Sequence, residues 1–348
     1  MDREGTTMRA CAATAMASAL VFLGSFSSGV LGLDTHSHIR EFQDPNDPKI
    51  SGDFDYGVCR GTNPQCYSGW VSDRQEKVLI YTRTAGPRHA NLGPALPPGK
   101  NPPLTAAHVV QNALIKWLGE HGVGADWTED VTQINNLNQY KAVIFASTSR
   151  DTLWKHGTAV VPASAVNTTT GAHLDSAKTA LRQYMRAGGG FVGIHNAFGT
   201  EYNWPYYEGL LGNANYYDHG QFQDGTVNIV AKNDSSTNGL PPTFPFKDEW
   251  YNLRPFPTNV KFLATVDEDS LATKRTVHPG HGKFHPIAWC QYYDGGRVWV
   301  TTLGHDRDAF TDGSAFPGQA QFKQLIVNGI LSAMGNKPFC DNDGTSND

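Results

Sequence analysis

Histidines that follow predicted β-strands are the residues of this sequence best suited to chemistry. His89 comes shortly after the apolar run KVLIY, and His195 directly follows the run GFVGI. His305 is the last residue of TTLGH. Because the carboxyl ends of parallel strands meet at one edge of a sheet, where open α/β sheets bind ligands, we expect these imidazoles to converge. For His195 taken alone, a hydrogen-bonded histidine of the core is the alternative interpretation.

Further candidates lie between His195 and His305, in the motifs YYDHG, KDEWY and HPIAW. Histidines near a carboxylate supply either a general acid and base or the ligands of a metal ion. The residues that we expect to be catalytic are His89, His195, His219, Glu249 and His305. If a divalent metal ion is a cofactor, its expected ligands are His195, His219 and His305; the sequence does not identify the ion.

Arginine and aromatic side chains near these histidines suit a hydroxyl-rich substrate. Arg83 and Arg88 follow the first strand, and a planar guanidinium with five donors can bind substrate oxygens, although surface ion pairs are the alternative. Aromatic residues are dense after His195, and rings with polar tips can stack on a sugar face or pack ordinary helices. The expected substrate contacts are Arg83, Arg88, Trp204, Tyr207, Tyr251 and His285.

Several common functions are disfavoured by the sequence. Gly188, Gly190 and Gly193 formally satisfy GxGxxG, but they begin a strand, whereas a dinucleotide site needs them between a strand and a helix. HExxH, GxSxG and a phosphate loop are absent from the sequence. A net charge of −5 leaves no basic excess to neutralise phosphates, so nucleic acid is not an expected partner.

The elements that must position the histidines alternate between strands and helices. Strands are predicted at 77–81, 125–128, 143–146, 188–194, 226–231, 260–266, 287–292 and 297–302, and helices at 105–120, 173–186 and 318–334. Thr105 is the expected N-cap of the first helix, and Asp294 to Gly296 the hairpin turn between the last two strands. The pattern predicts an α/β fold with a mostly parallel, doubly wound sheet, helices on both faces and an added antiparallel hairpin.

The first 33 residues have the layout of a secretory signal peptide. Arg3 and Arg9 precede an uncharged run from Ala10 to Leu33 that ends in small residues. A membrane anchor is the alternative, since the run could just span a bilayer. We expect cleavage near Leu33, an extracellular protein and no membrane association afterwards.

The cysteines fit an oxidising compartment. Once Cys11 leaves with the signal peptide, four remain, and an even set predicts two disulfides. Of the three possible connectivities, Cys59 with Cys66 and Cys290 with Cys340 is favoured because the first two are close in sequence. Asn167 and Asn233 are expected N-glycan acceptors, in NTT and NDS.

Composition divides the remaining chain into three parts. An irregular arm rich in Asp, Pro, Gly and Asn is predicted at 34–76, an α/β domain at 77–335, and a polar tail at 336–348.

Six motifs in order resemble the ThuA-like family, which is named for trehalose utilisation. They are TRTAGPRH, GGGFVGIHNA, the aromatic stretch ending at His219, DEWY, HPIAWCQYYDGGRVWVTTLGH and the final helix. The resemblance covers roughly 77–335 and implies a flavodoxin-like fold similar to class I glutamine amidotransferases. It places His195 near the position of the amidotransferase cysteine, which argues against glutamine hydrolysis. It also implies a role in carbohydrate metabolism.

Together these features predict a secreted carbohydrate-active enzyme that acts on an oligosaccharide or polysaccharide. Removal of a proton from a sugar carbon, or activation of water, would make it a lyase, isomerase or hydrolase. One alternative is a noncatalytic carbohydrate-binding protein that uses Trp204, Tyr206, Tyr207, Trp250 and Tyr251. The other is a metal-dependent hydrolase of an amide or ester.

Overall fold

The computed structural model describes residues 54–55, 57–154, 176–273 and 277–340, all of which belong to the unit from Glu41 to Asp348. The predicted signal peptide, the glycan acceptor Asn167 and the first residues of the helix expected at 173–186 lie outside the described residues. Asn233, the other predicted acceptor, is exposed in a turn.

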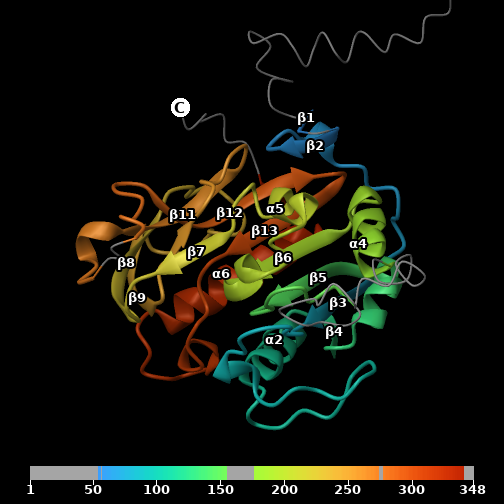
Figure 1. Ribbon diagram of the computed structural model, residues 1–348, viewed down its shortest axis with the longest axis horizontal. Coiled ribbons are helices and arrows are strands. Elements are labelled where there is room, and N and C mark those ends of the chain that lie inside the picture. Colours follow the sequence, from blue (N-terminus) through green and yellow to red (C-terminus); the bar gives the residue numbers. More distant parts are fainter. Residues whose placement is uncertain (1–53, 56, 155–175, 274–276, 341–348) are drawn as a thin grey trace, which may run out of the picture. The chain divides into compact units, whose positions relative to one another are not determined.

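A mixed, 11-stranded sheet forms the centre of the described chain (Figure 1). Its main path runs β4 (Gly124–Thr128), β3 (Gln75–Tyr81), β5 (Tyr140–Ala146), β6 (Gly190–Ile194), β13 (Gly296–Thr301), β12 (His285–Tyr293), β11 (Lys261–Asp267), β8 (Gln223–Ile229) and β9 (Thr243–Asp248). The arm before residue 77 adds β2 (Val58–Gly61), which pairs with β12, and β1 (Phe54–Asp55), which pairs with β2. A separate antiparallel pair is formed by β7 (Tyr216–His219) and β10 (Tyr251–Leu253).

The sheet is parallel in one half and antiparallel in the other. Neighbouring strands are parallel from β4 to β13, as the strand and helix alternation predicts. The predicted hairpin between β12 and β13 is present, and β11, β8 and β9 extend the antiparallel part beyond it. The sequence does not predict β9, because Pro245 interrupts its pattern; a proline is tolerated there because β9 is an edge strand.

Helices cover both faces of the sheet, which confirms the predicted layering. Val78 and Ile80 of β3 pack in the same core cluster as residues of α2 (Val109–Gly119) and α6 (Gln319–Met334). Leu79 and Tyr81 point the other way, into a second cluster with α4 (Ser176–Arg186) and α5 (Pro205–Leu210). This alternation along one strand is what a sheet buried on both faces requires.

Short 3-10 helices connect several of these elements. They are η1 (Pro64–Cys66), η2 (Ala90–Leu92), η3 (Val131–Gln139), η5 (His195–Gly199), η6 (Glu268–Ser270) and η7 (Asp308–Phe310). The prediction that Thr105 caps α2 is wrong, because the helix begins at Val109 and His108 is the residue before it. Thr105 Oγ1 lies 3.0 Å from His108 Nδ1 instead. In the described part of the chain, every helix is too short or too polar to cross a membrane.

The two disulfides have the favoured pairing. Cys59 and Cys66 are joined across 7 residues, and Cys290 and Cys340 across 50 residues. The second bond fixes the chain after α6 to β12, and Phe339 beside it is buried. The part of the predicted polar tail up to Cys340 is therefore attached to the core.

Candidate functional site

The strand directions bring distant residues to one edge of the sheet. β3, β6 and β13 are parallel and end at this edge. His89, His195 and His305 follow these strands in the sequence and therefore lie at the same edge. β9 ends here too, because it pairs with β8 so that Asp248 lies opposite Gln223, and β8 and β12 both begin at this edge. The antiparallel strands therefore add Glu249 to the histidines that follow the parallel ones.

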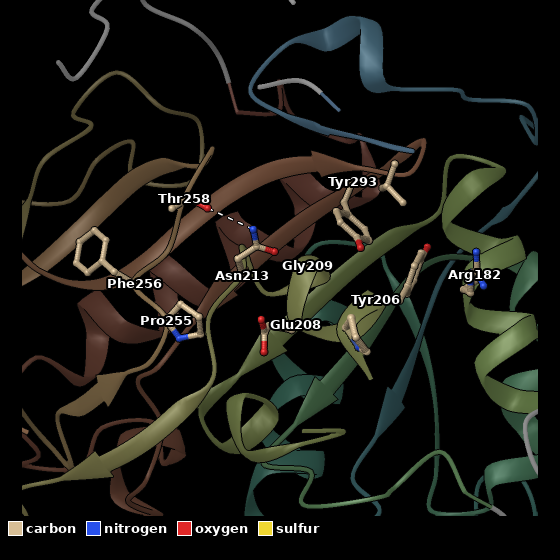
Figure 2. Close-up of a pocket in the computed structure, with 11 residues that line it drawn as sticks. Arg182, Tyr206, Glu208, Gly209, Asn213, Pro255, Phe256, Thr258 and Tyr293 are labelled. Carbon is tan, nitrogen blue, oxygen red and sulfur yellow. Dashed lines mark hydrogen bonds between the residues drawn. The ribbon is translucent and has the colours of Figure 1, made fainter. Parts of the chain in front are cut away.

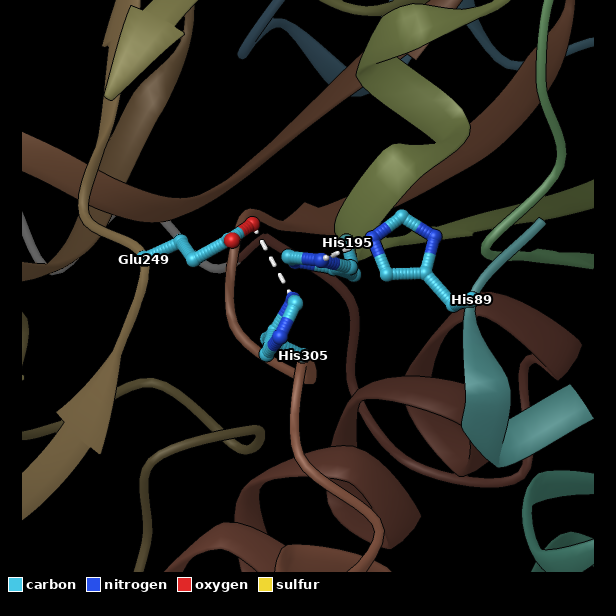
Figure 3. A group of neighbouring side chains, drawn as sticks. All are labelled: His89, His195, Glu249 and His305. Carbon is cyan, nitrogen blue, oxygen red and sulfur yellow. Dashed lines mark hydrogen bonds and ion pairs between the residues drawn. The ribbon is translucent and has the colours of Figure 1, made fainter. Parts of the chain in front are cut away.

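His89, His195, Glu249 and His305 form one cluster, called here the histidine cluster (Figure 3). One donor atom from each of the four side chains lies within 4.8 Å of the others. His89 Nε2 is 3.1 Å from His195 Nε2, and His305 Nδ1 is 3.0 Å from Glu249 Oε2. The expected convergence of His89, His195 and His305 is thus present in the structure.

His195 is the most constrained member of the cluster. Its side chain is fully buried and its φ angle is 53°, a left-handed conformation unusual for a residue other than glycine. Its Nδ1 lies 2.8 Å from the carbonyl oxygen of Thr302, which can only accept a hydrogen bond. Nδ1 must therefore carry the proton, and in the neutral ring the lone pair of Nε2 faces the cluster.

Burial and the neighbouring histidines keep the inner imidazoles neutral. Burial lowers the pKa of His195 well below its usual value, with His89 and His305 lowering it further. Burial and His305 likewise lower the pKa of His89 to about 4. Both rings therefore have an unprotonated nitrogen at neutral pH, able to accept a proton or bind a cation.

Glu249 contacts both outer histidines, His219 and His305. Burial alone would raise its pKa, but His305 and His219 lower the pKa below its usual value, so Glu249 is a carboxylate. Burial alone would lower the pKa of His305, but Glu249 and Asp248 raise it. His219 lies at the margin: its Nε2 is 3.7 Å from Glu249 Oε1, and its Nδ1 is 2.7 Å from the carbonyl oxygen of Gly220.

The group of four differs from the expected metal ligands. It contains His195 and His305 but has His89 and Glu249 in place of His219. All of the residues expected to be catalytic thus lie at the site, and His219 contacts the cluster through Glu249.

Asp248 holds together the two loops that carry Glu249 and His305. Its buried carboxylate accepts hydrogen bonds from the backbone N–H of Gly304 at 2.7 Å and of Glu249 at 2.8 Å. Burial raises the pKa of Asp248 to about 7. The motif KDEWY drew attention to this pair of carboxylates, but only strand register shows that Asp248 fixes backbone while Glu249 faces the histidines.

Tyr251 belongs to the site, whereas His285 lies behind it. The Tyr251 hydroxyl is 2.9 Å from His195 Nε2, and its ring stacks on the His195 ring with centroids 4.6 Å apart. His285 was expected to contact substrate, but it is buried, with Nδ1 2.7 Å from Glu268 Oε1 and Nε2 2.9 Å from the carbonyl oxygen of Tyr251. Its contacts support the backbone of Tyr251 instead.

The two arginines expected to bind substrate are bonded to the protein itself. Arg83 Nη1 donates to the carbonyl oxygens of Thr152 and Trp154, both at 2.6 Å. Arg88 donates to backbone carbonyls of its own loop, including that of Gly93 at 2.7 Å, and to Glu129 Oε1 at 2.7 Å. These guanidinium groups fix the loops after β3 and β5.

Two aromatic side chains that were expected to contact substrate pack against other parts of the protein. Tyr207 is fully buried, and its hydroxyl donates to the carbonyl oxygen of Ala197 at 3.1 Å. Trp204 is half-buried and stacks on Tyr206, with the Lys178 ammonium 5.3 Å from its ring centroid. Tyr207 therefore presents no ring face to a substrate in this structure.

Two aromatic rings that the sequence analysis did not select lie beside the cluster. The centroid of Phe222 is 5.3 Å from that of His305, and the Lys247 ammonium lies 4.8 Å from the Phe222 ring. Tyr216 packs against Tyr251 with centroids 4.5 Å apart. Aromatic density in the sequence marked the right segment for Tyr216, but the ring neighbours depend on the pairing of β7 with β10.

A cavity of about 500 Å³ lies at the opposite end of the strands (Figure 2). Its lining includes Tyr206, Glu208, Phe256 and Tyr293, and it contains no member of the histidine cluster. Tyr293 is the last residue of β12, whereas His285, at the edge where the histidines meet, is the first. The cavity is therefore separate from the site with the chemically reactive groups.

Comparisons with known proteins agree with this architecture. The family model described as trehalose utilisation, ThuA, matches residues 77–333. The crystal structure of a ThuA-like protein from Bacteroides uniformis ATCC 8492 has 21% sequence identity and a TM-score of 0.52, over 76% of this chain and 95% of that chain. One from Parabacteroides merdae ATCC 43184 has 18% identity and a TM-score of 0.51, over 75% and 90%. No curated protein matches the sequence.

Proposed function

The chain belongs to the trehalose-utilisation (ThuA) family, and we propose that it is a carbohydrate-active enzyme whose reaction takes place at the histidine cluster. The observation that carries this proposal is the direction of the His195 Nε2 lone pair. The carbonyl of Thr302 fixes the proton on Nδ1, so Nε2 presents an electron pair to a site lined by other imidazoles and a carboxylate. Side chains from four separate strand ends are combined there, which a purely structural histidine does not require.

This arrangement supports abstraction of a proton from a sugar carbon or activation of water. A general base must reach the proton that it removes, and the site must hold charge that develops on the substrate. His195 supplies the electron pair, Glu249 a negative charge, and His305 and His219 lie around that carboxylate. The products would be those of a lyase, isomerase or hydrolase acting on an oligosaccharide or polysaccharide.

The surroundings of the cluster suit a sugar better than a flat or strongly charged ligand. Phe222 and Tyr216 give apolar surface near His305 and Tyr251. Polar atoms of Glu249, His219 and His305 remain partly exposed beside them, with side chains 17%, 30% and 30% accessible. Such a mixture of aromatic surface and hydrogen-bonding groups matches the apolar faces and hydroxyl edges of a pyranose.

Burial of the aromatic residues disfavours a noncatalytic carbohydrate-binding protein. Such a protein would bind sugar through its aromatic rings, but three of the five candidate rings, Tyr207, Trp250 and Tyr251, are at most 2% exposed. A sugar cannot stack on a ring whose faces are covered by protein. A metal-dependent amide or ester hydrolase uses the same cluster but has no further feature in its favour.

We also propose that the protein is secreted. The uncharged run at 10–33 after Arg3 and Arg9 and the two disulfides both fit export to an oxidising compartment. Sequencing the N-terminus of the exported protein is the direct test. Recovery of the exported protein with residues 1–33 intact would contradict signal-peptide cleavage.

A glycan-degradation screen tests the enzymatic proposal. The wild-type protein, His195→Ala and the control His121→Ala would be incubated with a panel of oligosaccharides and polysaccharides, and products followed by mass spectrometry. His121 is an exposed histidine outside the cluster, so its loss should leave turnover unchanged. We expect His195→Ala to lose at least about a hundredfold in turnover. Full turnover by His195→Ala on an identified substrate would refute the proposal.

A further inference from the structure

We propose that His89, His195, His305 and Glu249 together bind one divalent first-row transition metal ion. The inference rests on the proposed function and refines it: an ion held by these four side chains would occupy the His195 Nε2 lone pair, so it would polarise a sugar or water oxygen in place of direct proton abstraction by His195. Three observations support it. They are the number of hydrogen-bond donors compared with lone pairs in the cluster, the distances between its ligand atoms, and the contacts that hold its ligands.

The first argument is that the cluster has too many donors for one lone pair. Both His89 Nε2, at 3.1 Å, and the Tyr251 hydroxyl, at 2.9 Å, lie within hydrogen-bond distance of His195 Nε2. A neutral imidazole nitrogen has one lone pair in the ring plane, so it cannot accept from both with good geometry. If His89 instead presents its own lone pair, two lone pairs face each other, an arrangement that a cation between them makes favourable.

The other nitrogen of His89 leaves the tautomer of this ring unconstrained. Nδ1 of His89 is buried and, among the residues that the structure describes, has no hydrogen-bond partner. Cation binding at Nε2 would leave the ring's proton on Nδ1, away from the ion, without loss of any bond now made there. His195 has the complementary arrangement, with its Nδ1 proton donated to Thr302.

The second argument is geometric. Bonds of about 2.1 Å from a tetrahedral ion would place its ligand atoms about 3.4 Å apart. In the cluster, the His89 and His195 nitrogens are 3.1 Å apart, the His305 nitrogen and the Glu249 oxygen are 3.0 Å apart, and all four donor atoms lie within 4.8 Å of one another. Side-chain rotations that move each ligand atom by about 1 Å would therefore convert the present arrangement into a coordination shell.

His195 is held as a metal-binding histidine usually is. A coordinating histidine generally donates its other N–H to a carbonyl or carboxylate, which fixes the ring and its tautomer; Thr302 does this for His195. Asp248 binds the backbone on both sides of the site, at Gly304 and at Glu249. Loops that carry two of the ligands are thus tied to each other by a buried group that is not itself in the cluster.

The donor set defines the kind of ion. Three imidazoles and one carboxylate suit Zn²⁺ and its first-row neighbours, whereas Ca²⁺ and Mg²⁺ prefer oxygen ligands. One negative charge on Glu249 partly compensates a divalent cation. The side chains of His305 and Glu249 are 30% and 17% accessible, so an ion could enter and still contact a substrate oxygen.

A second group of histidines offers the matched control. The rings of His278, His281 and His285 lie in a row with centroids 4.8 Å apart. Both nitrogens of His285 are hydrogen-bonded, and one lone pair of each other ring accepts a backbone hydrogen bond: His278 Nδ1 from Gly280 N–H and His281 Nε2 from Leu253 N–H. Proximity of imidazoles is therefore shared by both groups, whereas opposed lone pairs distinguish the histidine cluster.

Metal binding by the untagged, exported protein tests the inference. The protein would be stripped with a chelator, dialysed against Zn²⁺ at micromolar concentration and analysed for bound metal, and Co²⁺ would be used to record visible absorption. We expect one Zn²⁺ per chain and the strong absorption of a low-coordinate Co²⁺ site. His89→Ala and Glu249→Gln should each weaken binding at least about tenfold, and His278→Ala should bind as the wild type does. Circular dichroism of the metal-free variants checks that they are folded.

The outcomes separate this inference from the proposed function. Failure of the stripped wild type to bind stoichiometric Zn²⁺ or Co²⁺, or unchanged affinity in both His89→Ala and Glu249→Gln, would overturn the metal site. Glycan turnover that depends on His195 but survives complete metal removal would also overturn it while leaving the proposed function intact. Stoichiometric binding lost in these variants supports the metal site even if no glycan in the panel is converted.

Discussion

His89 and His195 are 106 residues apart in the sequence, yet their Nε2 atoms lie 3.1 Å from each other. The contact exists because β3 and β6 are both parallel to β5, so the chain leaves them at the same edge of the sheet. His305 joins through β13 and Glu249 through the antiparallel strand β9. Both halves of the mixed sheet therefore contribute to one site.

Replacing His195 by asparagine should separate its chemical role from its backbone conformation. Asparagine tolerates the positive φ of 53° better than most residues, so we expect the fold to persist, with a loss of about 1 kcal/mol from the smaller side chain. Turnover should fall at least about a hundredfold, because the carboxamide cannot act as a base. Thermal melting and product formation would be measured together. His195→Ala, which also places a strained residue here, should melt lower than His195→Asn.

Asp248→Asn should destabilise the protein although it preserves the shape of the side chain. Both carboxylate oxygens accept backbone hydrogen bonds, from Glu249 and Gly304, so an amide group would oppose one N–H with another. We expect a cost of about 1 to 3 kcal/mol in the free energy of unfolding and a loss of turnover, since the loops of Glu249 and His305 separate. Urea unfolding gives the first quantity. The exposed Asp224→Asn on β8 serves as control, and equal stability of the two variants would argue against the positioning role.

Asp126 should make stability depend on acid pH. Its buried carboxylate accepts hydrogen bonds from Asn101 at 2.6 Å and Tyr140 at 2.8 Å and lies 2.7 Å from Lys77 Nζ. Burial alone would raise the pKa of Asp126, but these partners lower it below its usual value. A lowered folded-state pKa stabilises the protein above the unfolded pKa of about 4, and this contribution disappears as pH falls through the folded-state pKa.

Comparison with Asp126→Asn isolates that effect. We expect the variant to be less stable by about 3 kcal/mol at neutral pH, because Lys77 loses its buried partner. The difference from wild type should shrink as pH falls below about 4. Urea unfolding of both proteins at several pH values measures it. A difference that stays constant from neutral pH to acid would show that the charge of Asp126 contributes little.

The two disulfides should contribute unequally to stability. Cross-linking the longer loop restricts the unfolded chain more, so the 50-residue separation of Cys290 and Cys340 should be worth about 4 kcal/mol and the 7-residue separation of Cys59 and Cys66 about 2 kcal/mol. Paired serine variants compared by urea unfolding would measure both contributions. Removal of the shorter link costing more than removal of the longer one would contradict the loop-entropy explanation.

The sequence by itself determined the layers and the main catalytic candidates. Apolar runs such as KVLIY and GFVGI are typical of strands covered on both faces, and a histidine placed just after such a run is then expected at a strand end. The favoured pairing of Cys59 with Cys66 and the turn at Asp294 rested on short separations. These are local properties, readable because each depends on a few consecutive residues.

Only the tertiary structure decided which side chains face the site. His285 and Tyr207 occur in promising motifs but are turned into the interior, and Arg83 and Arg88 are held by backbone carbonyls of nearby loops. Glu249 reaches the histidines while Asp248, one residue earlier, binds backbone, because successive side chains of an extended chain point in opposite directions. Which of the two faces the cluster depends on the register of β9 against β8, and a contact between distant strands is not encoded in any short stretch of sequence.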